Sequence, residues 1–256
     1  MKDLFNLSGK TALITGSSSG MGKAIAEILG LYGAKIIISS NDNDACQSVL
    51  KEFKAKGILA FSIPCDVSKK EEIDFLFSKI SSKVGQIDIL VCCVGIAFTG
   101  SFLEINSENF EKTMQINLQS VIYLTKLVIP KMQEKKGGSI IYLSSIAGVR
   151  GNKSLGLYGI SKAGLAQLAR NLAVEFGPDN IRINSISPGV IDTEFAKPLT
   201  SNAEIMEKRL LLTPLRRIGK VAEIAGVALL LASKAGGFMT GQNIIIDGGT
   251  TISDGN

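Results

Sequence analysis

Tyr158 stands four residues before Lys162 in the stretch LYGISKAGL, and these two side chains are the first candidates for proton transfer in the chain. The sequence contains no histidine, the side chain that most often moves protons near neutral pH. A free tyrosine has a pKa of about 10, so it serves as a base at neutral pH only if a positive charge stabilises its anion. Residues four apart on a helix lie side by side, with roughly 5–6 Å between Cβ atoms, so Lys162 could supply that charge. The spacing alone also fits a core aromatic residue on a buried helix.

The sequence around this pair alternates between short apolar runs and longer segments in which apolar residues recur at intervals of three and four. Nearly unbroken apolar strands favour a sheet covered on both faces, which means parallel strands joined by crossover helices. We therefore predict a single α/β domain over residues 1–256, with a Rossmann-type, doubly wound, seven-stranded parallel sheet and six helices on its two faces. The predicted strands are residues 11–15, 35–39, 58–65, 87–93, 139–144, 181–186 and 243–247.

A glycine-rich turn, LITGSSSGMGKAIA, joins the first predicted strand to the first predicted helix. Gly16, Gly20 and Gly22 permit a tight turn, close approach of the backbone to a pyrophosphate, and close packing of the helix on the strand. The helix N-terminus then offers unpaired N–H groups to the phosphates. An ordinary β–α turn can hold the same triplet, so the position between first strand and first helix is what favours dinucleotide binding. The turn is not a P-loop, because no Lys-Ser/Thr pair follows its last glycine.

One long irregular stretch, from about residue 190 to residue 220, holds two prolines and a short helical piece, NAEIMEKRLLL. Such a segment in a compact domain is usually a lid or a binding loop. We therefore predict that residues 190–220 form a substrate lid.

The composition argues against several other classes of protein. The net charge of +5 is modest and scattered, and tryptophan is absent, so no nucleic-acid surface is expected. No apolar stretch approaches the roughly 18 residues that cross a membrane, and the start MKDLFNLSGK lacks the apolar core of a signal peptide. We therefore expect a soluble, cytoplasmic protein without a membrane partner. No metal site is expected either, because zinc-type paired spacings are missing among Cys46, Cys65, Cys92 and Cys93.

Several motifs in a fixed order resemble the short-chain dehydrogenase/reductase family, over about residues 8–249. The family's T-G-x-x-x-G-x-G turn corresponds to Thr15–Gly22, and its serine corresponds to Ser145, thirteen residues before Tyr158. The segment INSISPGVIDT is similar to the family's P-G-x-x-x-T segment beside the nicotinamide. The stretches CDVS, MQINLQS and TGQNIIIDGG resemble the family's adenine-contacting aspartate, its helix asparagine and its closing strand.

The resemblance implies an NAD(P)-dependent oxidoreductase that transfers a hydride between a nicotinamide cofactor and a secondary alcohol or ketone. The substrate would be a small molecule such as a 3-oxoacyl thioester, steroid, sugar or small ketone. Tyr158 would exchange the proton, with its pKa lowered by Lys162 and by the positive charge of the oxidised nicotinamide. Ser145 would bond the substrate oxygen as charge develops on it, Lys162 would hold the nicotinamide ribose, and Asn117 would hold a water in a proton relay. The resemblance also implies a homotetramer.

Each of these residues has a simpler interpretation when it is taken singly. Ser145 could be a helix cap and Asn117 a polar residue on a buried helix.

The cofactor contacts that the resemblance implies involve the loops that follow successive strands. They are Gly16, Ser18, Ser19, Gly20, Met21, Gly22, Ser40, Asn41, Asp66, Val67, Cys93, Val94, Gly95, Tyr158, Lys162, Pro188, Gly189, Ile191 and Thr193.

Two departures from the family pattern affect the cofactor. The family usually has Asn-Asn-Ala-Gly after the fourth strand, where this chain has Cys-Cys-Val-Gly at residues 92–95, and a thiol is a weak hydrogen-bond partner. An NAD-preferring member carries an acidic residue at the position of Ser40, and an NADP-preferring member often has a basic residue at the position of Asn41 or Ser19. The chain has neither, so the cofactor is NADP or NAD, with a weak lean to NADP because no carboxylate repels a 2′-phosphate.

Two other classes of function fit the sequence. The first is a catalytically silent NAD(P)-binding regulatory protein, against which the complete set of Asn117, Ser145, Tyr158 and Lys162 argues. The second is a binding module for a different nucleotide, which would produce no change in nicotinamide fluorescence on titration.

Overall fold

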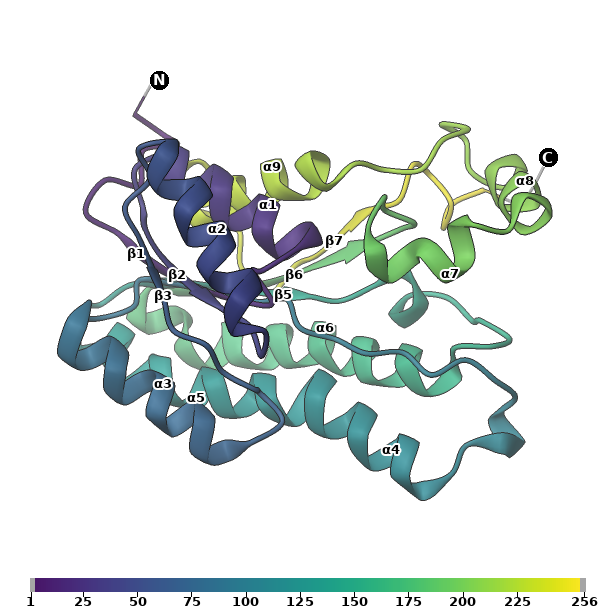
Figure 1. Cartoon of the computed structure of the whole chain (residues 1–256), viewed down its shortest axis with the longest axis horizontal. Helices are drawn as coiled ribbons and strands as arrows, with labels where there is room; N and C mark the ends of the chain where they lie inside the picture. Colours follow the sequence, from purple (N-terminus) through teal and green to yellow (C-terminus); the bar gives the residue numbers. More distant parts are fainter. Residues whose placement is uncertain (1–2, 254–256) are drawn as a thin grey trace.

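The computed structural model describes residues 3–253, and within them the chain forms one sheet of seven strands (Figure 1). The spatial order is β3-β2-β1-β4-β5-β6-β7, and every neighbouring pair is parallel. The predicted Rossmann-type, doubly wound fold in a single domain is therefore confirmed. The strands are β1 (Thr11–Thr15), β2 (Lys35–Ser39), β3 (Ala60–Ser62), β4 (Ile89–Cys92), β5 (Gly138–Leu143), β6 (Ile181–Pro188) and β7 (Asn243–Ile246).

The central strand β1 illustrates why the strands are apolar along nearly their whole length. Leu13 packs in the core cluster on one face of the sheet, whereas Ala12 and Ile14 pack in the cluster on the other face. Because successive side chains of a strand point to opposite faces, a strand covered on both sides needs apolar residues throughout.

The third strand is shorter than predicted, because β2 pairs with it only over Ala60–Ser62 instead of residues 58–65. The apolar residues on either side of it, Ile58, Ile63 and Cys65, are buried without belonging to the ladder. The apolar run therefore predicted burial at these three positions but not at Leu59, which is exposed, and it did not predict the extent of strand pairing.

Helices cover both faces of the sheet (Figure 1). Residues of α1, α2 and α9 pack in one core cluster, and residues of α3, α5 and α6 pack in the other. The described residues contain nine α-helices, whereas six crossover helices and one short helical piece were predicted. One predicted helix is divided in two, the predicted helical piece within residues 190–220 forms a helix, and a second short helix precedes it there. The helices of the described residues are α1 (Gly20–Leu31), α2 (Asn43–Ala55), α3 (Lys70–Lys83), α4 (Ser107–Met114), α5 (Ser120–Glu134), α6 (Gly156–Phe176), α7 (Lys197–Thr200), α8 (Ala203–Leu211) and α9 (Val221–Ala232).

The divided helix contains a π-helical turn over Gln115–Gln119, between α4 and α5. Such a turn inserts one extra residue into an otherwise regular helix and is frequent at functional sites. Periodicity of three and four does not reveal a single inserted residue, so the sequence predicted one continuous helix here.

The order of the strands reverses at β1. The chain runs from β1 outward through β2 to β3, and then returns to β4 on the other side of β1. The loops after β1 and β4 therefore diverge at the carboxyl ends of these strands, which is where open α/β sheets bind ligands. No helix within residues 3–253 is both long and apolar enough to cross a membrane.

Candidate active site

Tyr158 and Lys162 lie one turn apart in the first half of α6, and both side chains are buried. The Lys162 Nζ lies 5.6 Å from the centroid of the Tyr158 ring. The same Nζ donates a hydrogen bond of 2.8 Å to the carbonyl oxygen of Leu143, the last residue of β5. The lysine is therefore fixed between the end of a strand and the tyrosine, as the spacing of the pair predicted.

The pKa values of this pair are governed mainly by burial. Burial raises the pKa of Tyr158 to about 12, although a hydrogen bond with the Ser145 side chain opposes the rise. Burial also lowers the pKa of Lys162 to about 8. As far as the protein's own groups are concerned, the pKa of Tyr158 is therefore raised by desolvation and not lowered as we expected from Lys162. At neutral pH the tyrosine carries its proton and can donate it.

The buried lysine leads to a prediction about stability. Its pKa is lowered from 10.5 to about 8 on folding, so between these values the unfolded chain binds more protons than the folded chain. The free energy of unfolding must therefore rise with pH in this range, by about 3 kcal/mol from this group. The same contribution is lost as the pH falls back to 8. Denaturant unfolding between pH 7.5 and 10 should show that the free energy of unfolding of the wild type rises with pH relative to that of Lys162→Met. Parallel curves for the two proteins would contradict the lowered pKa.

Ser145 lies two residues beyond the end of β5 and contacts the tyrosine hydroxyl through its side chain. Its Oγ also accepts a hydrogen bond of 3.1 Å from the N–H of Ala147, which caps the short 3-10 turn Ile146–Gly148. The structure thus shows the simpler capping role and a contact with Tyr158 that the sequence did not indicate, and the bond from Ser145 to a substrate oxygen stays a prediction.

Two glycines bring α6 close to this turn. A Cβ on Gly159 would lie 2.5 Å from the carbonyl oxygen of Ala147, and a Cβ on Gly148 would lie 2.6 Å from the N–H nitrogen of Ala163. No larger residue fits at either position, so both glycines are needed for the approach that places Tyr158 beside Ser145. The sequence analysis did not identify this requirement.

Asn117 lies in the π-helical turn and is fully buried. Its Oδ1 accepts from the N–H of Ile96 at 2.8 Å, and its Nδ2 donates to the carbonyl oxygen of Ile96 at 2.9 Å and to Ser161 Oγ at 3.0 Å. The amide therefore holds the loop after β4 against α6 and keeps both donors occupied. A water-holding role for this side chain stays a prediction.

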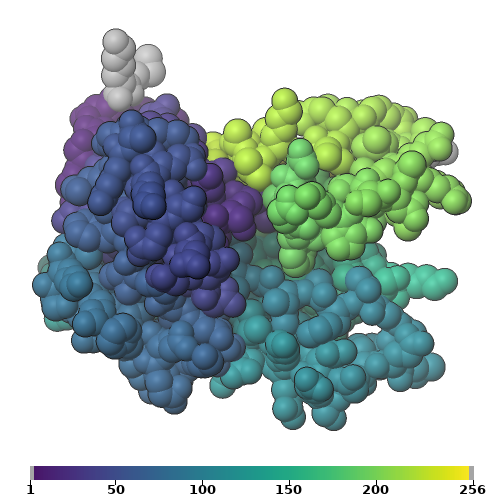
Figure 2. All heavy atoms as spheres, viewed as in Figure 1, coloured from purple at the N-terminus to yellow at the C-terminus, as the bar shows by residue number. Residues whose placement is uncertain are grey.

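A cleft of about 480 Å³ opens at the carboxyl ends of β1 and β4. Figure 2 shows the hollow between the blue N-terminal part of the chain and the green segment that follows β6. All of the predicted cofactor residues line it except Pro188, Gly189 and Ile191. Sequence reasoning missed the remaining lining residues, which are Asp42, Cys65, Ile96, Ile116, Leu143, Ser144, Glu194 and Phe195.

The glycine-rich turn has the geometry that a pyrophosphate requires. Gly16 has a φ of +70°, and a Cβ on Gly22 would lie 2.1 Å from the carbonyl oxygen of Gly16. The N-cap of α1, Ser19, makes no side-chain capping bond, so the first N–H groups of this helix have no side-chain acceptor there. No acidic residue stands in the first turn of α1. These features fit an anionic group at the N-terminus of the helix.

The end of β2 is polar but carries no free carboxylate. Ser40 Oγ accepts a hydrogen bond of 3.0 Å from Ser18 Oγ, which joins the two loops at the floor of the cleft. Asp42 caps α2 by accepting from the N–H of Ala45 at 2.9 Å. Lys162 is the only basic side chain among the described residues that line the cleft.

The adjacent cysteines replace the family's asparagines without becoming reactive groups. Cys92 is buried in β4, and the N–H of Cys93 donates weakly to Thr15 Oγ1 at 3.4 Å. Burial raises the pKa of the Cys93 thiol to about 11, so it is protonated at neutral pH and a poor nucleophile. Within residues 3–253 no cluster of three or more histidine, cysteine, aspartate or glutamate side chains could hold a metal ion.

Segment 190–220 contributes an aromatic residue to the site. The Phe195 ring, from the 3-10 turn Glu194–Ala196, lies 6.3 Å from the Tyr158 ring between centroids. Both rings line the cleft. The sequence predicted that this segment closes over a substrate, but it did not indicate which side chain reaches the tyrosine.

Comparison with known proteins agrees with this geometry. A family model described as enoyl-(acyl carrier protein) reductase matches residues 16–251. A tropinone reductase homolog of Arabidopsis thaliana is 37% identical over 253 residues, which are 98% of this chain and 94% of the relative.

Two solved structures superpose on nearly the whole chain. A gluconate 5-dehydrogenase from Burkholderia cenocepacia in complex with NADP and tartrate has a TM-score of 0.94 at 29% identity, and covers 98% of each chain. A 7α-hydroxysteroid dehydrogenase complexed with NADH and 7-oxo glycochenodeoxycholic acid has a TM-score of 0.94 at 36% identity, and covers 97% of each chain. Since relatives more than 30% identical match over almost their full length, this chain belongs to the short-chain dehydrogenase/reductase family of oxidoreductases.

Proposed function

We propose that this protein is an NAD(P)-dependent dehydrogenase/reductase that interconverts a secondary alcohol and a ketone at the cleft beside Tyr158. The observation that carries the proposal is the buried Tyr158 on the cleft wall, with the Ser145 side chain against its hydroxyl and the Lys162 Nζ 5.6 Å from its ring centroid. The glycine-rich turn and the N-terminus of α1 would hold the cofactor's pyrophosphate, and the ends of β2 and β4 would hold its adenosine half. When bound, the nicotinamide ring would supply or accept the hydride.

The protein's own groups would handle the proton and the substrate oxygen. The hydroxyls of Ser145 and Tyr158 would bond the ketone oxygen and stabilise the negative charge that develops on it. Tyr158 would give its proton to that oxygen during reduction and take it back during oxidation. The Lys162 ammonium would stabilise the tyrosine anion left after the transfer, and the Phe195 ring would exclude water from the reacting atoms.

The direct test is a panel of ketones and alcohols assayed with NADPH and NADH at the nicotinamide absorbance band. The relatives suggest bile-acid steroids, sugar acids and tropinone as members of the panel, beside 3-oxoacyl thioesters. Turnover of at least one substrate is expected. Cofactor binding without any turnover would favour the silent regulatory alternative, and no fluorescence change with either cofactor would contradict dinucleotide binding altogether.

We also propose a weak preference for NADP. Asp42 is occupied in capping α2, and no carboxylate at position 40 repels a 2′-phosphate, but no arginine is present to pair with it either. The preference should be under about tenfold, or less than ~1.4 kcal/mol. Fluorescence titration with NADPH and NADH should show Asn41→Arg increasing the preference and Ser40→Asp reversing it, with Ser40→Ala as the neutral control. A wild-type preference for NAD above about tenfold would contradict this prediction.

The lid is proposed from the low burial of its helices. The turn Glu194–Ala196 and the helices α7 and α8 contain no buried residue, and segments with few buried contacts open most readily. Trypsin should therefore cut first within residues 197–220. Lys197 precedes a proline and is a poor site, so the first cut is expected after Arg216 or Arg217. Mass spectrometry of a digestion series should show slower cutting with cofactor and substrate analogue together. A first cut elsewhere, or no protection, would indicate an inert surface segment.

We further propose a homotetramer, as the family resemblance implies. Apolar side chains are exposed on α6, at Ile160 and Val174, and near the sheet edge formed by β7, at Phe238 and Ile245. Association through these surfaces would cover them. Analytical ultracentrifugation should give the mass of four chains, and a monomer at micromolar concentration would contradict the proposal.

A further inference from the structure

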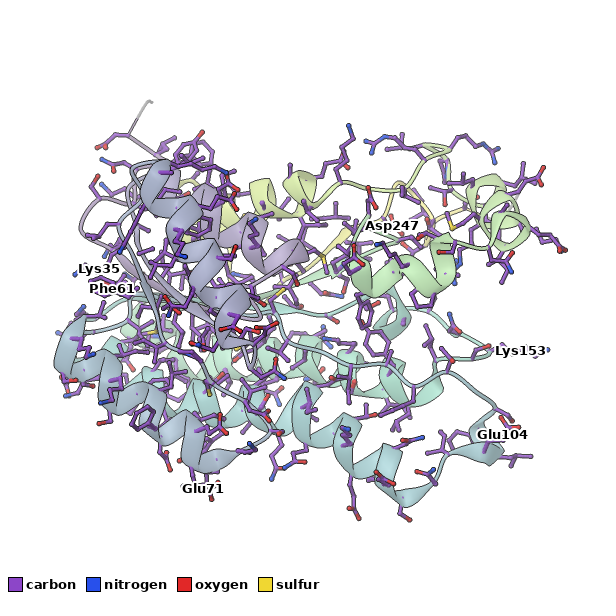
Figure 3. All side chains as sticks on the ribbon, viewed as in Figure 1. Lys35, Phe61, Glu71, Glu104, Lys153 and Asp247 are labelled. Carbon is purple, nitrogen blue, oxygen red and sulfur yellow. The ribbon has the colours of Figure 1, made fainter. Side chains whose placement is uncertain are left out.

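A second cavity, of about 90 Å³, lies between α8 and the turn that follows β7. Arg150 reaches it from the loop after β5, five residues beyond Ser145, and Ile191 lines it two residues before Thr193 of the cofactor cleft. Figure 3 labels Asp247, another lining residue, at the end of β7 beside the lid. Two of the segments that form this cavity, the loop after β5 and the chain after β6, therefore also border the proposed catalytic groups.

Two arginines in this cavity have no acidic partner among residues 3–253. The guanidinium of Arg209, on α8, makes no hydrogen bond or ion pair with any described residue. Arg150 donates only to the carbonyl oxygen of Thr250, at 3.2 Å. Burial and the nearby charge of Arg150 together lower the pKa of Arg209 from its ordinary value. Two like charges thus face one partly buried space.

The acidic groups of the cavity are already engaged. Glu223 receives two hydrogen bonds from Arg217, at 2.9 and 2.6 Å. Asp247 accepts from the N–H groups of Gly249 and Thr251, at 2.9 and 2.7 Å. The two N–H groups do not cancel the charge of Asp247, so three arginines and two carboxylates leave this lining with one net positive charge. Neither Arg150 nor Arg209 is paired with these carboxylates, and a guanidinium matches a carboxylate or another oxyanion with two parallel hydrogen bonds.

The size and lining of the cavity limit what can enter. Its volume of about 90 Å³ is smaller than the roughly 150 Å³ that an engineered cavity needs to hold benzene. A carboxylate fits in such a space, whereas a whole sugar or steroid does not. Met206, Leu210, Leu215 and Ile246 form apolar walls that suit the carbon body next to an acidic group.

We propose that Arg150 and Arg209 form a subsite for the carboxylate of an acidic keto or hydroxy substrate whose reacting carbon lies at Tyr158. The anion site is inferred from the lining of the cavity alone, whereas its assignment to the substrate rests on the proposed dehydrogenase function. The two parts therefore need separate tests.

The anion site is tested without turnover, by titrating sulfate at constant ionic strength and following the midpoint of thermal unfolding. Wild type should show a saturable stabilisation, and Arg209→Met should weaken it by about tenfold or more. Lys208→Met is the matched control, because Lys208 is an exposed cation on the same helix that is paired with Glu204 at 2.6 Å. If Arg209→Met does not fold, Arg150→Met replaces it. Equal sulfate dependence in all the proteins overturns the anion site.

The substrate assignment is tested with methyl ketones that carry a terminal carboxylate on chains of increasing length, each beside its methyl ester. One chain length should favour the acid over the ester in kcat/KM by about tenfold or more, and Arg209→Met should abolish that difference while Lys208→Met retains it. Sulfate should compete with the acid and not with the ester. Sulfate that binds without competing overturns the substrate assignment, and so does an ester reduced as well as its acid. If no ketone is reduced at all, the proposed function fails while the sulfate titration still decides the anion site.

Discussion

Tyr158→Phe is expected to lower kcat for ketone reduction by roughly a thousandfold while leaving the cofactor dissociation constant nearly unchanged. The substitution removes the hydroxyl that donates the proton and that contacts Ser145, but it keeps the ring that lines the cleft beside Phe195. A positioned general acid typically contributes about 10²–10⁴-fold, and the loss of a bond to the developing oxyanion adds to that effect. Steady-state rates with saturating cofactor, together with fluorescence titration of NADPH, measure both quantities.

A second buried tyrosine supplies the control for this experiment. The Tyr142 hydroxyl bonds Thr125 Oγ1 at 2.9 Å within the core and does not line the cleft. Tyr142→Phe should therefore cost about 1 kcal/mol of stability and leave kcat unchanged. A Tyr158→Phe enzyme that retains more than about a tenth of the wild-type rate would show that another group donates the proton.

Lys162→Met is expected to lower kcat/KM by about 10² to 10³-fold and, unlike Tyr158→Phe, to weaken cofactor binding by about tenfold or more. The ammonium lies behind the tyrosine ring and on the cleft wall, so its loss removes both the charge that favours the tyrosine anion and a cofactor donor. The free energies follow from the ratio of kcat/KM values and from the titrated dissociation constants.

Lys35→Met is the matched control for the lysine. Lys35 also donates to a backbone carbonyl, that of Val84 at 3.3 Å, but it lies at the far end of the sheet from the lid (Figure 3). Its replacement should change neither rate nor affinity. Unchanged cofactor affinity in Lys162→Met would show that the lysine does not hold the ribose and acts through the tyrosine alone.

The sequence predicted the features that depend on local chemistry. Strands buried on both faces need apolar residues at every position, so the seven runs marked the seven strands, although β3, β4 and β7 were predicted too long, β6 too short and β5 one residue out of place. The glycine-rich turn could be predicted from the sequence because its backbone geometry excludes side chains at Gly16 and Gly22. The pair on α6 was readable because a separation of four residues fixes proximity on any helix.

Other features were decided by contacts between segments distant in the sequence. The Phe195 ring of the lid lies next to the Tyr158 ring. The Asn117 amide is hydrogen-bonded to Ile96 and Ser161 from a π-helical turn that the sequence periodicity did not reveal. Pro188, Gly189 and Ile191 match the family motif but do not line the cleft. Ile191, three residues beyond the end of β6, lines the second cavity instead.

The sequence by itself therefore determined which fold forms and predicted which side chains would move a proton. The pKa values of those side chains were decided only by the tertiary structure. Burial raises the pKa of Tyr158 and lowers that of Lys162, and how far each group is removed from water depends on the packing of β5, α6 and the lid around it. The placement of Arg150 and Arg209 at one cavity was also decided by the tertiary structure, because no local pattern brings together residues that are 59 positions apart.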